Sequence, residues 1–168
     1  MAIAQHMPAP FTRSLASRLS SGTDWEVREA TDGREAIPGV VWLAPGGHNL
    51  ELVRQDEMIF LAVSASGGRA RWCPSGDLLF SSAARCFGSR AVGVVLTGMG
   101  DDGAEGALAI AGAGGVVICE GRETAVIPGM PDSAARLVPQ AQRLPLPAIA
   151  QEVDRVLSGI GAGRTPAC

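Results

Sequence analysis

The sequence predicts an α/β protein with a doubly wound, mostly parallel sheet, helices on both of its faces and an antiparallel hairpin as an appendage. Short apolar runs alternate along the chain with segments of helical periodicity, which is typical of a parallel sheet with crossover helices. Several of the strand-like runs are continuously apolar, as expected where helices cover both faces of a sheet. With 168 residues, 46% of them hydrophobic, the chain is expected to form one domain.

The first elements are a strand end and a helix. A short apolar segment at residues 2–5 predicts the end of a strand. Phe11, Leu15 and Leu19 recur at a spacing of four residues, which places them on one helix face. Two prolines precede Phe11, so the helix is predicted to begin there and to end at Gly22.

Strand patterns follow in the middle of the chain. Residues 25–30 alternate between apolar and polar side chains, and residues 40–47 form an apolar run that ends in a turn. Residues 50–63 contain two strand patterns around a polar bend, which predicts the hairpin. Ser75 is a favourable cap for a helix that is predicted to end at Gly88.

The second half of the chain repeats the order of strand and helix. Residues 91–96 and 114–120 are predicted strands, and a helix rich in small residues follows the first of them. Residues 131–137 and 146–157 are predicted helices. Residues 158–168 are expected to form a flexible tail.

Composition narrows the classes of function. The net charge is −3 and no long basic run occurs, so no nucleic-acid partner is expected. The apolar runs are far shorter than the ~20 residues of a membrane span, and the first residues do not resemble a signal peptide. The four cysteines form no C-x-x-C pair, and the chain has two histidines. We therefore expect a cytoplasmic protein with reduced thiols, no metal and no cofactor.

A glycine pattern of the form G-x-G-x-x-G begins at Gly98, between a predicted strand and a predicted helix. This layout is typical of a dinucleotide-binding turn, and Glu120 lies about 20 residues on, where a ribose-binding acid is expected. However, Asp101 and Asp102 lie inside the turn. Each would repel a bound phosphate by about 4 kcal/mol at about 4 Å and an effective dielectric constant of about 20. A dinucleotide-binding oxidoreductase domain is therefore kept only as a second alternative.

Asp101 and Asp102 allow two other interpretations. An aspartate at this place can cap the following helix, and one of the two is expected to do only that. The other can orient an imidazole, as in a Ser-His-Asp triad. His6 follows the first predicted strand, and the carboxyl ends of parallel strands lie at one edge of a sheet. His48 follows another strand but is interpreted as a turn residue.

Several segments resemble one known family. The segments QHMPAPFTRSLASRLS, WLAPGG, PSGDLLFSSAA, GVVLTGMGDDGAEGALAI and VIPGMP are similar, in this order, to the catalytic domain of the chemotaxis protein-glutamate methylesterases. The similarity extends from about residue 2 to about residue 155. It implies a doubly wound α/β catalytic domain, which we place at residues 1–157, with a Ser-His-Asp triad.

The resemblance also implies roles for individual residues. His6 is the general base, Asp102 is the acid that orients it, and the backbone N–H of Met99 contributes to the oxyanion hole. Asp101 is then the exposed cap. The implied substrates are methylated glutamates on the cytoplasmic helices of chemoreceptors, from which methanol is released. Many members of the family also deamidate receptor glutamines.

The family's nucleophile is a serine in a G-x-S-[ST]-G-G turn upstream of the Q-H-M-P segment. The sequence begins five residues before His6, so we expect an N-terminally truncated form of the domain. Ser66, in VSASGG, imitates the motif but falls in the hairpin region. The alternative is a non-catalytic remnant that binds a receptor or another partner. Regulation is expected from a receiver domain in trans, because no receiver domain precedes this segment.

Overall fold

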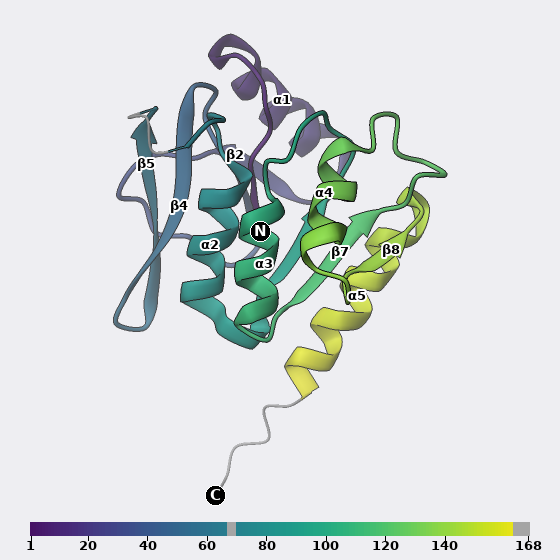
Figure 1. The fold of residues 1–168 in the computed structure, drawn as a ribbon. Helices are drawn as coiled ribbons and strands as arrows, with labels where there is room; N and C mark the ends of the chain where they lie inside the picture. Colours follow the sequence, from purple (N-terminus) through teal and green to yellow (C-terminus); the bar gives the residue numbers. More distant parts are fainter. Residues whose placement is uncertain (67–69, 163–168) are drawn as a thin grey trace, which may run out of the picture. The chain divides into compact units, whose positions relative to one another are not determined.

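The structure is a computed structural model that describes residues 1–66 and 70–162 of the chain. The fold divides into two compact units, Met1–Cys86 and Phe87–Cys168, here called the first unit and the second unit (Figure 1). Each unit contains a parallel sheet of three strands. None of the helices in the described part of the chain is long and apolar enough to cross a membrane.

The first unit is built on a parallel sheet with the strand order β1-β3-β2. Its strands are β1 (Ala2–Ile3), β2 (Glu26–Glu29) and β3 (Val40–Leu43). The four residues of β3 are all buried, which agrees with the continuous apolar run that predicted this strand. Each of these strands is shorter than its predicted segment, because the ends of the predicted ranges form the connecting turns.

Helix α1 (Ala9–Gly22) packs against this sheet. The packed residues come from the helix and from all three strands: Ile3, Leu15, Ala16, Leu19, Val27, Val41 and Leu43. The helix begins two residues before the predicted start. Proline is tolerated there, because the N–H groups of the first turn of a helix have no acceptor within the helix. Phe11 is 55% exposed and is absent from the packed group, so the predicted apolar face begins only at Leu15.

The hairpin is formed by β4 (His48–Gln55) and β5 (Met58–Ala65), which pair antiparallel. This confirms the predicted hairpin and extends it by two residues at each end. Helix α2 (Gly76–Phe87) lies beside β4 in Figure 1. The Ser82 hydroxyl on α2 accepts a hydrogen bond from the Leu52 N–H at 2.9 Å, so the two elements are in direct contact.

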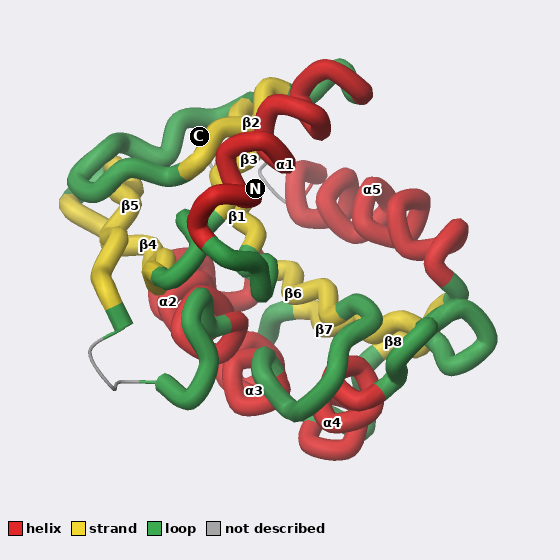
Figure 2. The backbone as a smooth tube through the Cα atoms, turned by 90° about the horizontal axis from the view of Figure 1, so that it is seen from above, coloured by secondary structure: helices red, strands yellow, loops and turns green. Residues whose placement is uncertain are grey.

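The second unit has a parallel sheet with the strand order β6-β7-β8. After the short 3-10 helix η1 (Gly88–Arg90), its elements are β6 (Val92–Val95), α3 (Ala104–Gly112), β7 (Val116–Glu120), α4 (Gly129–Leu137), β8 (Gln142–Leu144) and α5 (Leu146–Ala162). Figure 2 shows α3 and α4 on one face of this sheet and α5 on the other. Parallel strands flanked by helices, together with the antiparallel hairpin, confirm the predicted fold class.

Two elements of the second unit differ from the prediction. Strand β8 is not predicted from the sequence, because its three residues have neither strand alternation nor an apolar run. It forms by parallel pairing with β7, with Arg143 opposite Cys119. Helix α5 continues five residues beyond residue 157, where the flexible tail was predicted to follow. The remainder of the predicted tail, residues 163–168, lies outside the described residues.

Candidate active site

The glycine turn, residues 98–103, joins β6 to α3 in the second unit. Gly98 lies against the start of α4, where a Cβ atom on Gly98 would overlap the sulfur of Met130. The Gly98 N–H donates to the Ile127 carbonyl at 2.8 Å, and the Met130 N–H donates to the Gly98 carbonyl at 2.8 Å. The missing side chain at Gly98 therefore lets the turn pack closely against α4.

The other two glycines of the pattern are required by backbone conformation. Gly100 has φ of 99° and Gly103 has φ of 87°, both in the left-handed region that favours glycine. Gly103 is also the N-cap of α3, so the prediction that an aspartate occupies the capping position is wrong. The Asp101 carbonyl accepts the Ala104 N–H at 3.1 Å and so joins the turn to the first residue of α3.

The two aspartates of the turn differ in exposure. Asp101 is exposed, whereas Asp102 is 1% exposed and is engaged in interactions within the structure. A carboxylate is buried at acceptable cost only when its oxygens have partners. The difference agrees with the expectation that Asp102 turns inward and Asp101 outward, while the catalytic role of Asp102 stays a prediction.

Glu120 supports the strand end that precedes the turn. Its side chain is 2% exposed, and one carboxylate oxygen accepts the Thr97 N–H at 2.8 Å. The Thr97 hydroxyl in turn accepts the Ile127 N–H at 2.8 Å. The sequence suggested Glu120 as a ribose-binding acid, whereas the structure shows that it holds Thr97 at the base of the turn.

Met99 lies at the tip of the glycine turn and is 75% exposed. No group within residues 1–66 and 70–162 accepts a hydrogen bond from its backbone N–H. A backbone N–H without an acceptor in the protein can donate a hydrogen bond to a ligand oxygen on which negative charge develops. The assignment of Met99 to an oxyanion hole stays a prediction.

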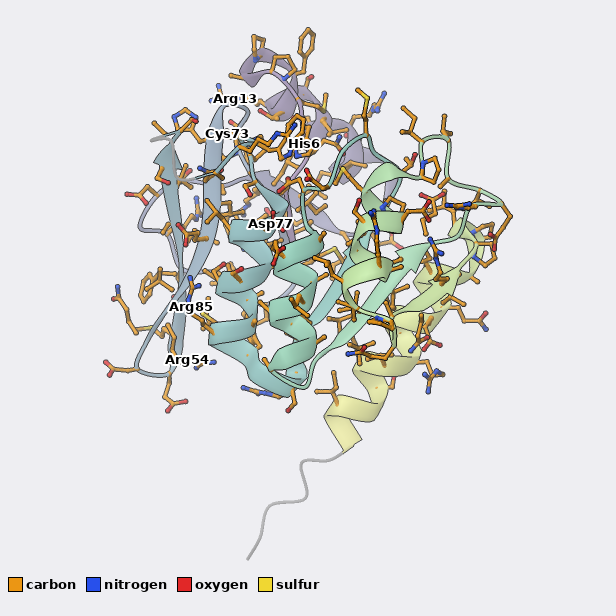
Figure 3. The ribbon with its side chains drawn as sticks, viewed as in Figure 1. His6, Arg13, Arg54, Cys73, Asp77 and Arg85 are labelled. Atoms are coloured by element: carbon orange, nitrogen blue, oxygen red, sulfur yellow. The ribbon has the colours of Figure 1, made fainter. Side chains whose placement is uncertain are left out.

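His6 lies in the first unit, in the loop between β1 and α1, and is exposed (Figure 3). Its imidazole stacks on the indole of Trp72, with ring centroids 5.6 Å apart and an angle of 25° between the planes. The Arg71 guanidinium lies 5.2 Å from the centroid of the Trp72 ring. Stacking restricts the orientation of the imidazole. Nothing in the local sequence pattern indicated Trp72 as a neighbour of His6.

The backbone next to His6 is held by the turn after β3. A Cβ atom on Gly46 would lie 2.5 Å from the Met7 carbonyl oxygen, so only glycine permits this contact. The Gly46 N–H donates to the hydroxyl of Thr12 at 3.1 Å, and that hydroxyl donates to a Glu29 carboxylate oxygen at 2.6 Å. Thr12 is completely buried. The Pro-Gly-Gly turn therefore fixes the segment that carries His6.

Two neighbouring residues begin β4 and have different roles. His48 is exposed, and its Nδ1 lies 3.3 Å from the Gly46 carbonyl oxygen, in keeping with a turn residue. Asn49 is 1% exposed, and its side-chain oxygen accepts the Ser75 N–H at 3.0 Å. The Ser75 hydroxyl accepts the Leu78 N–H at 3.3 Å. Asn49 therefore positions the residue that caps α2.

The hydroxyl groups of several serines are used by the fold. Ser14 and Ser17 are exposed on α1 and donate to main-chain carbonyls of the preceding turn. Ser82 is buried between α2 and β4. Ser66 is exposed just after β5, and the glycines that follow it in the sequence lie outside the described residues.

Cys73, Cys86 and Cys119 are free thiols, and Cys73 lies in the region of His6 because it follows Trp72 (Figure 3). Burial raises the pKa of the Cys119 thiol to about 11. Among the described residues, no group of three or more His, Cys, Asp or Glu side chains is arranged to hold a metal ion.

Comparison with known proteins identifies the family. Residues 1–153 match the family model described as CheB methylesterase. The crystal structure of the Thermotoga maritima CheB methylesterase catalytic domain superposes with a TM-score of 0.87 and 38% sequence identity. That match covers 92% of this chain and 82% of the Thermotoga chain.

Relatives with similar sequences are much longer than this chain. A protein-glutamate methylesterase/protein-glutamine glutaminase from Anaeromyxobacter dehalogenans is 48% identical over 137 residues, which cover 79% of this chain and 39% of the relative. A protein of the same name from Bordetella parapertussis is 43% identical over 160 residues, covering 95% of this chain and 45% of the relative. This chain spans about two fifths of the length of these relatives. With a family match over most of its length and a closely similar solved domain, the chain belongs to the CheB methylesterase family.

Proposed function

We propose that this chain is the catalytic part of a chemotaxis protein-glutamate methylesterase. It hydrolyses glutamate methyl esters on the cytoplasmic helices of chemoreceptors and releases methanol. The observation that carries the proposal is the match of residues 1–153 to the CheB methylesterase family. The relatives' names support deamidation of glutamine as a second reaction. The proposed setting is the cytoplasm, with a receiver domain acting in trans.

His6 is the proposed general base. An ester carbonyl requires a hydroxyl nucleophile that is activated by a base with a pKa near neutrality, and histidine is the side chain that meets this requirement. The exposure of His6 leaves its ring accessible, and stacking on Trp72 supports a defined ring orientation. His6 takes the proton of the nucleophile and returns it to the leaving methoxide, which departs as methanol.

Asp102 is the proposed acid that orients the imidazole and stabilises the imidazolium. Its burial supports this role, because a carboxylate in a poorly solvated place interacts more strongly with a cation than one in water. The Met99 N–H is the proposed donor to the oxyanion of the tetrahedral intermediate. Its place in a turn held by Gly98, Thr97 and Glu120 supports a preorganised donor.

The nucleophile implied by the family resemblance is a serine in a G-x-S-[ST]-G-G turn ahead of the Q-H-M-P segment. Its hydroxyl attacks the ester carbonyl, the methoxide leaves, and water hydrolyses the acyl-enzyme with His6 again acting as the base. In deamidation the leaving group is ammonia and the steps are otherwise the same. The test of the proposal therefore begins with the full-length protein.

The first prediction concerns labelling of that protein by a fluorophosphonate, which reacts with activated serine hydroxyls. The N-terminus is first mapped by peptide mass spectrometry on protein from its own cells. We expect labelling of a serine upstream of His6, and we expect His6→Ala and Asp102→Asn each to slow labelling and methanol release by at least about 10³-fold. Asp101→Asn is the matched control, because Asp101 is the exposed neighbour, and its rate should stay within about twofold of the parent.

Two outcomes would contradict the proposal. If Asp101→Asn and Asp102→Asn slowed labelling and methanol release equally, Asp102 would have no specific role in catalysis. Absence of a labelled serine in the full-length protein would favour the alternative, a non-catalytic module that binds a receptor or another partner.

A further inference from the structure

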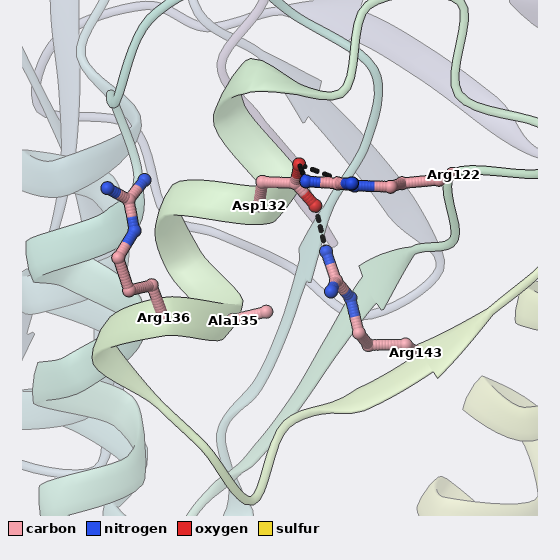
Figure 4. A pocket seen from close by; sticks show the side chains of 5 residues that line it. All are labelled: Arg122, Asp132, Ala135, Arg136 and Arg143. Carbon is pink, nitrogen blue, oxygen red and sulfur yellow. Dashed lines mark hydrogen bonds and ion pairs between the residues drawn. The ribbon is translucent and has the colours of Figure 1, made fainter.

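A pocket of about 460 Å³ in the second unit is lined by three arginines (Figure 4). Arg122 comes from the segment after β7, Arg136 from α4 and Arg143 from β8. Asp132 and Ala135, both on α4, complete the lining. We call this site the arginine pocket. Its residues are far apart in the sequence, so β8 and α4 must both be in place before it exists.

Asp132 holds two of the arginines in position. The Arg122 Nε and Nη2 atoms lie 2.9 Å and 2.7 Å from one carboxylate oxygen of Asp132. Arg143 donates to the other oxygen through Nη2. The hydrogen bond from Arg122 lowers the pKa of Asp132, so this carboxyl stays ionised at neutral pH. Both guanidinium groups are therefore oriented before any ligand arrives.

Arg136 adds a third cation to the pocket. Its Nη2 donates to the Ser133 hydroxyl at 3.0 Å. In the described part of the chain Arg136 makes no ion pair with a carboxylate. Three arginines and one aspartate give the pocket a formal charge of +2, in a chain whose net charge is −3. The pocket is therefore positively charged, although the chain as a whole is negatively charged.

We propose that the arginine pocket binds carboxylates of an acidic segment in a protein partner. A guanidinium has five N–H donors in a planar fork that matches a carboxylate. Asp132 uses only part of the donors of Arg122 and Arg143, and Arg136 keeps donors beyond the one that Ser133 accepts. Because Asp132 already holds the guanidinium groups of Arg122 and Arg143 in position, less conformational entropy is lost when a ligand binds.

Three features favour an acidic peptide over other anions. Asp132 lies within the pocket and repels a doubly charged phosphate more strongly than a singly charged carboxylate. The methyl group of Ala135 also lines the pocket and offers an apolar contact for the methylene groups of a glutamate side chain (Figure 4). The net charge of −3 disfavours a long polyanion such as nucleic acid.

The test is a direct binding measurement, so it does not depend on the proposed esterase activity. A fluorescein-labelled peptide of alternating glutamate and alanine is titrated with the 168-residue chain and followed by fluorescence anisotropy. We expect saturable binding that weakens as salt rises from about 50 to about 200 mM. Arg136→Glu should weaken binding by at least about tenfold, and Arg136→Gln by less.

Arg90→Glu is the matched control, because Arg90 is an exposed arginine of the same unit and the change of charge is the same. It should change the affinity by no more than about twofold, because Arg90 does not line the arginine pocket. Unfolding by urea verifies that both variants fold. Arg136 makes no ion pair in the described residues, so its replacement is expected to leave the fold intact.

Three results would overturn the proposal. Equal weakening by Arg136→Glu and Arg90→Glu would show general charge attraction. Equal binding of a peptide with glutamine in place of glutamate would show that carboxylates are not recognised. Displacement of the peptide by inorganic phosphate, but not by acetate at the same ionic strength, would make phosphate the ligand.

Discussion

At the scale of single residues, burial determines how charged and ionisable groups behave in this fold. Asp102 and Glu120 are almost completely buried carboxyl groups, and both are engaged with other groups of the structure. Asp101, adjacent to Asp102, is exposed. Neighbours in the sequence therefore meet very different dielectric surroundings, and these surroundings decide which of them is suited to chemistry.

Cys119, on β7, carries a prediction at this scale. It is fully buried, and burial raises its pKa to about 11, while Arg143 lowers it and Asp132 raises it to smaller extents. The native state therefore retains the thiol proton at higher pH than the unfolded chain does. The protonated Cys119 thiol stabilises the native state fully at a pH below the pKa that this thiol has in the unfolded chain. This stabilisation is lost as the pH rises through about 11, the pKa of the thiol in the native state.

We expect the difference in unfolding free energy between the parent chain and Cys119→Ala to narrow as pH rises from 8 toward 11, measured by urea titration. In the native chain at pH 8, iodoacetamide should modify the partly exposed Cys73 and leave Cys119 unmodified. A constant difference across this pH range would contradict the burial argument.

At the scale of elements, two glycine contacts set where helices lie. Gly98 allows the glycine turn to pack on α4, and Gly46 allows the turn after β3 to pack on the start of α1. A side chain at Gly46 would overlap main-chain atoms of Met7 and Ala9, and one at Gly98 would displace the side chain of Met130. The pattern Gly-Met-Gly and the pattern Pro-Gly-Gly therefore act through packing between elements as well as through turn conformation.

Gly46 gives the prediction at this scale. Gly46→Ala should lower the free energy of unfolding by about 1–3 kcal/mol, because the new Cβ meets main-chain atoms that cannot move without shifting α1. The control is Gly22→Ala at the end of α1, where a Cβ would meet nothing within 4 Å. Urea unfolding should show a lower midpoint for Gly46→Ala alone. A similar loss in both variants would rule out the packing explanation.

At the scale of the whole molecule, the fold class is compatible with more than one function. Parallel α/β sheets with a glycine turn after a strand also bind dinucleotides, so the fold alone does not assign an activity. Membership of the CheB methylesterase family supports the hydrolysis proposed above. The acid that a dinucleotide would need for its ribose, Glu120, is buried and accepts the Thr97 N–H instead.

We therefore expect the chain to show no saturable binding of NAD⁺ or NADH in isothermal titration calorimetry up to about millimolar concentration, which corresponds to about −4 kcal/mol of binding free energy. Two aspartates in the turn oppose a pyrophosphate there. Binding that saturates in this range would revive the oxidoreductase alternative and would weaken the hydrolase proposal.

Local patterns were sufficient to predict most of the secondary structure. The alternation of apolar and polar residues predicted the hairpin, the helical spacing of Leu15 and Leu19 predicted α1, and the glycine pattern marked the turn before α3. These features depend on residues that are close together in the sequence, so their signals are visible there. The prediction missed β8, whose strand state depends on pairing with β7 rather than on its own residues.

The sequence by itself determined the order of the elements apart from β8, the family and the residue types available for chemistry. Only the tertiary structure decided that Trp72 stacks on His6, that the Glu120 carboxylate accepts the Thr97 N–H, and that Arg122, Arg136 and Arg143 line one pocket. The physical reason is that burial and side-chain convergence arise from contacts between residues far apart in the chain. No local periodicity encodes such contacts.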